Sequence, residues 1–399
     1  MTPRTQADSA VTARSGAGED PLADARGSDR SPDREGGVSQ RPSLESPEYL
    51  RISLAAAMTL GITPGWFYRD ACLHCINLLM TYDEGCAANC SYCGLQRQRE
   101  PSQQGKSFIR VPWPVVSLDE IAARSRQRLS AVKRVCLSMI THPRVAQDAR
   151  VILQRLHQEL PEVPISLLSN PTLLTRADLE FYRDIPIDRL GIAVDAATEP
   201  IFDRHRARQV QGPHRWERYW RFFEDALEVV GPNRVGIHLI VGLGETEEEM
   251  VRLIGRIRRA GGSTHLFSFF PEAGSSLAEH PQPPVGQYRR VQLARYLIDE
   301  DLATAETFSF DERGRLAGFG AAQERAEQVT AAGIPFMTSG CPDETGMVAC
   351  NRPFGDCTPG DDIRSFPFQP DEEDLVTIKG QLGEMEDARP YSRKTAGEM

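Results

Sequence analysis

Short apolar runs alternate with longer amphipathic stretches along most of this chain, and this alternation limits the possible folds more than any other feature. Buried strands separated by helices are typical of a parallel sheet, because each crossover between parallel strands needs a covering element. The expected strands are 76–82, 134–140, 165–169, 190–194, 235–241, 265–270, 304–310 and 334–337. The expected helices are 118–129, 146–159, 176–183, 216–230, 247–259, 288–299 and 321–332.

Eight strand and helix units over roughly 270 residues predict an α/β fold, a (β/α)8 or incomplete TIM-type barrel. A doubly wound open sheet is the alternative, and in both folds the functional residues follow the C-terminal ends of the strands. Residues 1–46 lack large apolar side chains and are expected to be a disordered leader. The barrel with its N-terminal extension is expected over 47–337. Residues 338–399 form a cysteine-containing segment that ends in an acidic tail.

The composition excludes several classes of partner. The net charge of −10 leaves no basic surface for nucleic acid or for an anionic membrane, so a carrier protein or a small molecule is expected instead. No stretch has the length of a membrane span, and the charged leader has no apolar signal sequence. The 9 cysteines are clustered, which favours metal ligation in a reducing compartment. We therefore expect a cytoplasmic protein.

Cys86, Cys90 and Cys93 follow the first expected strand in a C-x3-C-x2-C loop. Structural zinc usually takes four ligands in two pairs, whereas this loop has no fourth ligand nearby. Three thiolates suit a [4Fe-4S] cluster with one open iron, which the amino and carboxylate groups of S-adenosylmethionine can chelate. Electron transfer from such a cluster breaks a C–S bond and gives a 5′-deoxyadenosyl radical. Zinc or a purely structural cluster remains the alternative.

This loop resembles that of the radical S-adenosylmethionine superfamily, and the resemblance covers about residues 73–341. The segment 237–246 looks like the fifth strand of biotin synthase and its relatives, which supports the adenine and methionine ends of the cofactor. An ordinary strand-to-helix turn is the alternative there, as mere packing is for Tyr92 and a loop cap for Asp195. The cofactor contacts that the resemblance implies are Tyr92 at the adenine, Asp195 at the ribose, Ser138 at the methionine, and Ile240, Gly242 and Glu245.

A second group of cysteines lies just before the first expected strand and after the last one. The first and last strands of a barrel are neighbours, so the two parts of this group can meet although about 270 residues separate them. This predicts a second cluster, with isolated buried thiols as the alternative. The expected ligands are Cys72, Cys75, Cys341 and Cys350, and the candidates for the fourth position are Cys72, Cys357 and Ser365. The role of Cys136 stays open.

The C-terminal stretches 339–342, 350–355 and 364–368 resemble biotin-synthase-related proteins, in particular the two-protein lipoyl synthases of archaea and sulfur-oxidising bacteria. Only Cys136 stands where biotin synthase has cluster ligands on inner strands, which argues against biotin synthesis. Arg352 is expected to set the potential of the second cluster or to hold the carrier, with a plain surface arginine as the alternative.

The lipoyl synthase resemblance implies a radical sulfurtransferase, in which the second [4Fe-4S] cluster donates sulfur to C6 or C8 of a protein-bound octanoyl chain. The implied partners are a second radical subunit, an octanoylated lipoyl carrier and a low-potential electron donor such as ferredoxin. The alternatives are sulfur or methylthio transfer to another substrate, and a non-catalytic iron–sulfur electron carrier or sensor.

Overall fold

The computed structural model describes residues 43–99, 111–185, 187–360 and 362–383. Most of the expected leader and the end of the acidic tail lie outside these ranges. In the part of the chain that is described, no helix combines the length and the apolar character needed to cross a membrane.

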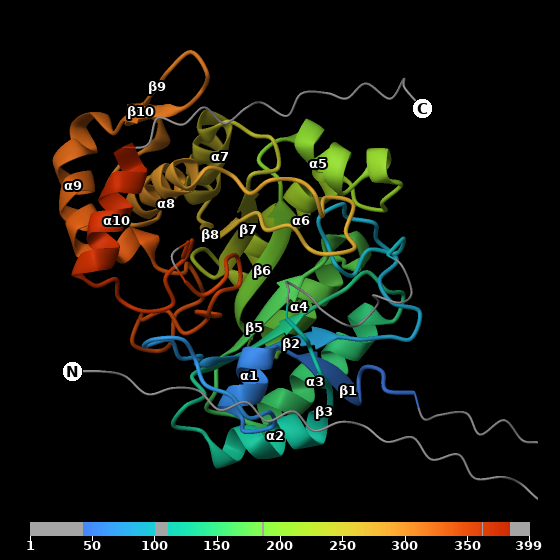
Figure 1. The fold of residues 1–399 in the computed structure, drawn as a ribbon. Helices are drawn as coiled ribbons and strands as arrows, with labels where there is room; N and C mark the ends of the chain where they lie inside the picture. Colours follow the sequence, from blue (N-terminus) through green and yellow to red (C-terminus); the bar gives the residue numbers. More distant parts are fainter. Residues whose placement is uncertain (1–42, 100–110, 186, 361, 384–399) are drawn as a thin grey trace, which may run out of the picture. The chain divides into compact units, whose positions relative to one another are not determined.

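The main sheet has eight strands in the order β3-β1-β2-β4-β5-β6-β7-β8, and its six central strands are parallel. Two short antiparallel strands extend it beyond β2. The sheet is an incomplete TIM-type barrel, which confirms the predicted α/β class (Figure 1). The parallel strands are β2 (Cys75–Met80), β4 (Arg134–Ser138), β5 (Ile165–Ser169), β6 (Ile187–Asp195), β7 (Val235–Val241) and β8 (Ser263–Ser268), and the added strands are β1 (Tyr49–Ile52) and β3 (Val115–Ser117).

Helices connect the parallel strands, and their ends carry recognisable capping signals. In α7 the side chain of Thr246 and that of Glu249 form a capping box, and three arginines occupy the last turn, where the helix dipole favours cations. A hairpin and two further helices lie beside α8 (orange and red in Figure 1). The helices are α1 (Leu54–Thr59), α2 (Leu118–Gln127), α3 (Val145–Glu159), α4 (Arg176–Asp184), α5 (Glu199–His205), α6 (Trp216–Val230), α7 (Glu247–Arg259), α8 (Val285–Asp299), α9 (Gln323–Ala332) and α10 (Glu372–Gly383), and the hairpin is β9 (Ser309–Phe310) with β10 (Leu316–Gly318).

Two of the expected strands do not join the barrel. In 304–310 a 3-10 turn comes first, and only Ser309–Phe310 is extended, where it pairs with β10 in a separate hairpin. In 334–337 the residues Ile334–Phe336 form a 3-10 turn around Pro335, which has no N–H group to donate to a sheet. Of the two predicted forms, the closed (β/α)8 barrel is therefore wrong, and the incomplete barrel is correct.

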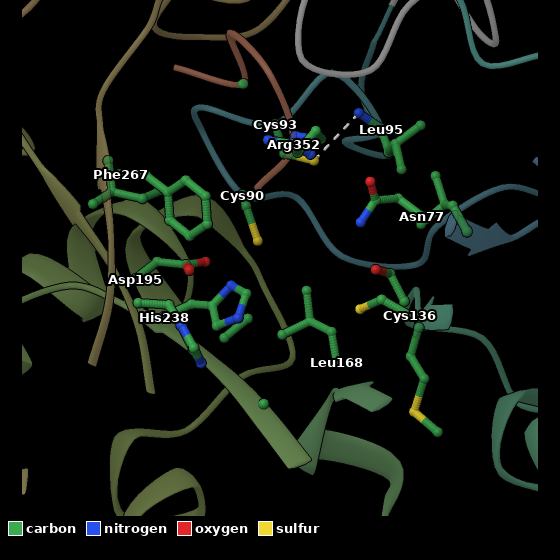
Figure 2. A pocket seen from close by; sticks show the side chains of 18 of the residues that line it. Asn77, Cys90, Cys93, Leu95, Cys136, Leu168, Asp195, His238, Phe267 and Arg352 are labelled. Carbon is green, nitrogen blue, oxygen red and sulfur yellow. Dashed lines mark hydrogen bonds between the residues drawn. The ribbon is translucent and has the colours of Figure 1, made fainter. Parts of the chain in front are cut away.

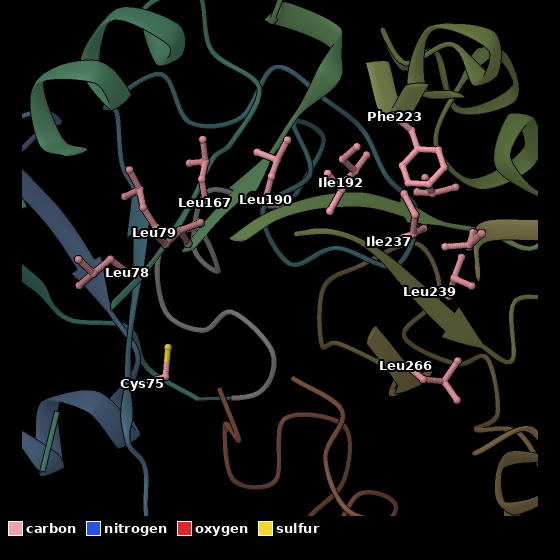
Figure 3. Packing of buried hydrophobic residues seen from close by; sticks show 14 of the residues in the cluster. Cys75, Leu78, Leu79, Leu167, Leu190, Ile192, Phe223, Ile237, Leu239 and Leu266 are labelled. Atoms are coloured by element: carbon pink, nitrogen blue, oxygen red, sulfur yellow. The ribbon is translucent and has the colours of Figure 1, made fainter. Parts of the chain in front are cut away.

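Side-chain alternation separates two faces of the parallel sheet. Outward-facing residues such as Ile192 and Ile237 are fully buried in an apolar core with Phe223 of α6 (Figure 3). The inward-facing residues are more polar and include Asn77 and Cys136. The outer face thus supplies most of the stability, and the inner face is free to carry chemistry.

The segment 338–356 contacts both β8 and β2, the two parallel strands that no hydrogen bonds join to each other. On one side the backbone N–H of Leu266 donates to Ser339 Oγ at 2.8 Å. On the other side Asn77 Nδ2 lies 3.6 Å from Cys350 Sγ. This segment therefore stands where further strands would complete a closed barrel.

Close packing inside this segment gives a test of its role. A Cβ atom on Gly340 would lie 1.9 Å from the carbonyl oxygen of Cys350. We expect Gly340→Ala to destabilise the fold by roughly 1–3 kcal/mol and to lower the melting temperature, because backbone would have to move. The control is Gly380→Ala in α10, where a Cβ atom meets nothing, and its melting temperature should stay the same or rise. Equal melting temperatures for the two variants would contradict this account of the segment.

Candidate active site

The loop that leaves β2 brings three thiols to one cavity of about 310 Å³. The N–H of Thr141 donates to Cys86 Sγ at 3.4 Å, and the N–H of Leu95 donates to Cys93 Sγ at 3.4 Å. Cys90 lines the same cavity (Figure 2). The three cysteines lie at the C-terminal ends of the parallel strands, where barrel enzymes place their reacting groups.

Burial keeps the free thiols of Cys90 and Cys93 protonated. Burial raises the pKa of Cys90 to about 11 and that of Cys93 well above its ordinary value, so the free thiols are protonated and metal binding must release protons. Within the described residues, no three His, Cys, Asp or Glu side chains are arranged to hold one metal ion. A cluster has several irons and accepts thiolates that stand farther apart.

A buried histidine fixes the cysteine loop to the end of β7. His205 accepts a hydrogen bond from Ser91 Oγ at its Nδ1 (2.8 Å), and its Nε2 donates to the carbonyl of Leu243 (3.1 Å). Burial lowers the pKa of His205 to about 4, so the ring is neutral and can accept a hydrogen bond at Nδ1 while it donates one from Nε2. Sequence analysis missed this residue, because no motif marks it.

Tyr92 and Asp195 meet at the rim of the cavity around a buried arginine. The hydroxyl of Tyr92 donates to Asp195 Oδ2 at 2.5 Å, and Arg206 Nη1 lies 2.9 Å from the same oxygen. Asp195 has a φ of 66°, in the left-handed region that a non-glycine residue seldom adopts. Arg206 also donates to the carbonyl of Val194 at 2.9 Å. Both predicted cofactor contacts thus face the cavity, and Arg206 is the cation that compensates the charge of Asp195.

The other predicted cofactor contacts divide into two groups. Ser138 and Ile240 line the cavity. Glu245 instead accepts hydrogen bonds from the N–H groups of Gly242 (2.6 Å) and Leu243 (3.0 Å), and it is not among the residues that line the cavity. The structure therefore shows Gly242 and Glu245 shaping the turn after β7, and their contact with a cofactor stays a prediction.

The inner face of the barrel changes character along its axis. On most strands the inward residue nearest the cysteine loop is apolar, and the one two positions earlier is polar or a thiol (Figure 2). We call the first set the apolar layer: Leu79, Leu168, Ile240 and Phe267. The second set is the polar layer: Asn77, Cys136, Ser166, His238 and His265.

A second group of thiols lies at the polar layer. Asn77 Nδ2 donates to the sulfurs of both Cys75 and Cys350, at 3.6 Å each. Hydrogen bonds from the thiols of Cys136 and Cys75 hold the pKa of Cys350 well below its ordinary value. Cys341 lies next to it, with its Sγ 3.9 Å from His265 Nε2.

The remaining predicted ligands are placed elsewhere. Cys72 is exposed, with its Sγ 3.1 Å from His74 Nε2. Cys357 is buried, and it is not among the residues that line the cavity. Ser365 lines the cavity but donates to Asp356 Oδ2 at 2.8 Å. Arg352 also lines the cavity, so it is not a plain surface residue.

Residues 80–257 match the family model described as the Radical SAM superfamily. Members of this superfamily are enzymes that use a [4Fe-4S] cluster and S-adenosylmethionine, and the thiols of Cys86, Cys90 and Cys93 fit such a cluster.

No curated protein matches the chain. Similar solved structures include methylornithine synthase, at 14% identity over 62% of this chain and 67% of that one with a TM-score of 0.43. The FeFe-hydrogenase maturase HydG from Carboxydothermus hydrogenoformans is 15% identical over 62% of this chain and 56% of its own, with a TM-score of 0.45. SuiB of Streptococcus suis is 13% identical over 54% of this chain and 45% of its own, with a TM-score of 0.40. The matches thus span about half to two thirds of these proteins.

The buried carboxyl group of Glu245 makes stability depend on pH. Burial raises its pKa to about 7, above the ordinary value of 4.5, so between these pH values the folded state holds a proton that the unfolded state has lost. The resulting stabilisation is complete below about pH 4.5 and is lost as pH rises through 7. We expect the melting temperature of wild type to fall relative to that of Glu245→Gln between pH 5.5 and 8, by an amount corresponding to roughly 2–3 kcal/mol. A constant difference between the two proteins would contradict the raised pKa.

Proposed function

We propose that this protein is a radical S-adenosylmethionine enzyme that inserts sulfur at C6 or C8 of a protein-bound octanoyl chain, in concert with a second radical subunit. One observation carries the proposal. A single cavity presents one group of thiols at the cysteine loop and another at the polar layer, and the apolar layer lies between them. A hydrocarbon chain in the apolar layer would have a radical source on one side and a sulfur source on the other.

The first thiol group would hold the cofactors that start the reaction. When bound to Cys86, Cys90 and Cys93, a reduced [4Fe-4S] cluster with S-adenosylmethionine supplies a 5′-deoxyadenosyl radical. Tyr92 and Asp195 face the same cavity and would orient the nucleoside. Arg206 keeps the Asp195 carboxylate in place through the 2.9 Å ion pair.

The apolar layer suits an uncharged acyl chain. Leu79, Leu168, Ile240 and Phe267 offer no hydrogen-bonding side chain, so they bind a hydrocarbon by excluding water. Each buried CH₂ group contributes about 0.8 kcal/mol to such binding. Exclusion of water also protects a reactive radical from side reactions.

The polar layer would supply the sulfur. The thiols around Cys350 would hold a second cluster, and this cluster would supply sulfide for the new C–S bond, with its iron taking up the one electron released when the carbon radical bonds to sulfide. The hydrogen of the broken C–H bond would leave with 5′-deoxyadenosine. The electron for cleavage of S-adenosylmethionine would come from a low-potential donor of the ferredoxin type. The octanoylated lipoyl carrier and the second radical subunit are the proposed macromolecular partners.

Cleavage of S-adenosylmethionine tests the radical chemistry itself. We expect anaerobically reconstituted protein with dithionite to form 5′-deoxyadenosine, measured by liquid chromatography, and Cys90→Ala to lose this activity because an iron loses its thiolate. Cys357→Ala is the matched control and should keep it, since Cys357 does not line the cavity. Absence of 5′-deoxyadenosine from the wild-type protein would contradict an enzyme and favour an electron carrier or sensor.

Mass spectrometry of an octanoyl-lysyl peptide tests the substrate. We expect a mass gain corresponding to sulfur when the second radical subunit is present, and no gain with an acetyl-lysyl peptide, which is too short to fill the apolar layer. The reaction should be run with and without the second subunit. If 5′-deoxyadenosine forms but the octanoyl peptide gains no sulfur in either case, the lipoyl assignment is wrong and another substrate must be sought.

A further inference from the structure

Three separate parts of the chain bring thiols to the polar layer: the start of β2, the middle of β4 and the segment 338–356. Cys75 pairs with Arg134 in the β2–β4 ladder, and Cys136 is the next inward residue on β4. Cys75 is completely buried, whereas Cys136 and Cys350 face the cavity. The sheet register therefore places Cys136 opposite Asn77, one inward position further along β2 than Cys75.

Asn77 lies in the middle of these thiols. Its amide nitrogen is 3.6 Å from both Cys75 Sγ and Cys350 Sγ, so a strand thiol and a C-terminal thiol share one donor. Cys136 hydrogen bonds with both thiols as well. Four polar groups packed this tightly in the interior of a barrel do not act as small hydrophobic residues.

The backbone holds a fourth thiol at the same place. The N–H groups of Ala349 and Cys350 both donate to the carbonyl oxygen of Cys341 at 3.0 Å, so Cys341 cannot separate from Cys350. The thiol of Cys341 faces His265, 3.9 Å away. Gly236 makes room for this imidazole, because a Cβ atom there would lie 2.6 Å from its Nε2.

Positive charge is provided beside these four thiols. Arg134 is 1% exposed, and its Nε donates to the carbonyl of Pro342 at 2.9 Å. Arg134 also forms an ion pair with Asp188. A buried arginine can offset part of the negative charge of several thiolates.

Cys72 is outside this arrangement. Its side chain is exposed and contacts His74, while its carbonyl oxygen accepts a 2.7 Å hydrogen bond from Asn351 Nδ2. The thiol of Cys72 is therefore not among the groups that line the cavity.

We propose that Cys75, Cys136, Cys341 and Cys350 are the complete ligand set of a second iron–sulfur cluster, with Cys136 in the place that sequence analysis gave to Cys72. Only the role of this cluster as sulfur donor rests on the proposed function. The ligands themselves follow from the sheet register, from Asn77 and from the backbone pairing of Cys341 with Cys350.

Iron and sulfide analysis tests the ligand set. The parent protein is the triple variant Cys86→Ala, Cys90→Ala, Cys93→Ala, which removes the first cluster site and should retain about four irons per chain after anaerobic reconstitution. Adding Cys136→Ala should reduce bound iron and sulfide by more than half and change the electron paramagnetic resonance spectrum of the reduced protein. Adding Cys72→Ala, the matched control, should leave both unchanged.

Three outcomes would overturn the assignment. Loss of iron with Cys72→Ala and not with Cys136→Ala would restore Cys72 as a ligand, and loss with both would place Cys72 in the set. A parent variant without iron would remove the second site altogether. Circular dichroism spectra and melting temperatures of Cys136→Ala and Cys136→Ser that match those of the parent protein would show that these variants fold. The iron analysis and the 5′-deoxyadenosine assay are therefore independent tests. A wrong ligand set does not contradict cleavage of S-adenosylmethionine, and absence of that cleavage does not change the interpretation of the iron content.

Discussion

The structure depends on the segment that covers the open side of an incomplete barrel. The parallel strands β8 and β2 are not hydrogen-bonded to each other: β2 pairs with β1, whereas β8 ends the sheet, and an unpaired strand edge inside a protein needs other partners. The segment 338–356 provides them through its contacts with Leu266 on one side and Asn77 on the other. This covering segment joins residues that are 273 positions apart in the sequence, and it places cysteines from the C-terminal part of the chain inside the barrel.

Strand alternation then determines what the cavity can do. Because inward residues recur at every second position, β2, β5, β7 and β8 each contribute one residue to the apolar layer and another to the polar layer. Gly191 and Gly236 keep the interior from becoming overpacked. A Cβ atom on Gly191 would come within 3.2 Å of His238 Nε2, and one on Gly236 would meet His265. Apolar binding and thiol chemistry thus occupy neighbouring levels of one barrel.

The sequence was sufficient for the features that are local in the chain. The strand that precedes the cysteine loop, the α/β alternation and Asp195 at the end of β6 were all predicted, since apolar runs and motif spacing report them directly. The short strands β1 and β3 were missed because they carry no such run, and Pro335 was overlooked as a sign against a strand.

The second thiol group shows why the rest of the site could not be predicted. Which cysteines meet depends on register and on the direction in which each side chain points. Cys72 and Cys75 are close in sequence, yet one is exposed and the other is completely buried. Cys136 was hard to assign because its partners come from β2 and from a segment without regular structure. His205 and Arg206 have no motif at all, and only the fold brings them to the cysteine loop and to Asp195.

The position of the covering segment also affects the order in which the protein can mature. Domains begin to fold from the N-terminus while the chain is being synthesised. The cysteine loop and the strands around it are complete once β8 has emerged, whereas Cys341 and Cys350 emerge last. A nascent chain would thus expose the interior of its barrel until the segment 338–356 has been made, and the polar layer would be accessible from the unfinished side during that interval. Metal loading of the two thiol groups would then be separated in time by translation itself.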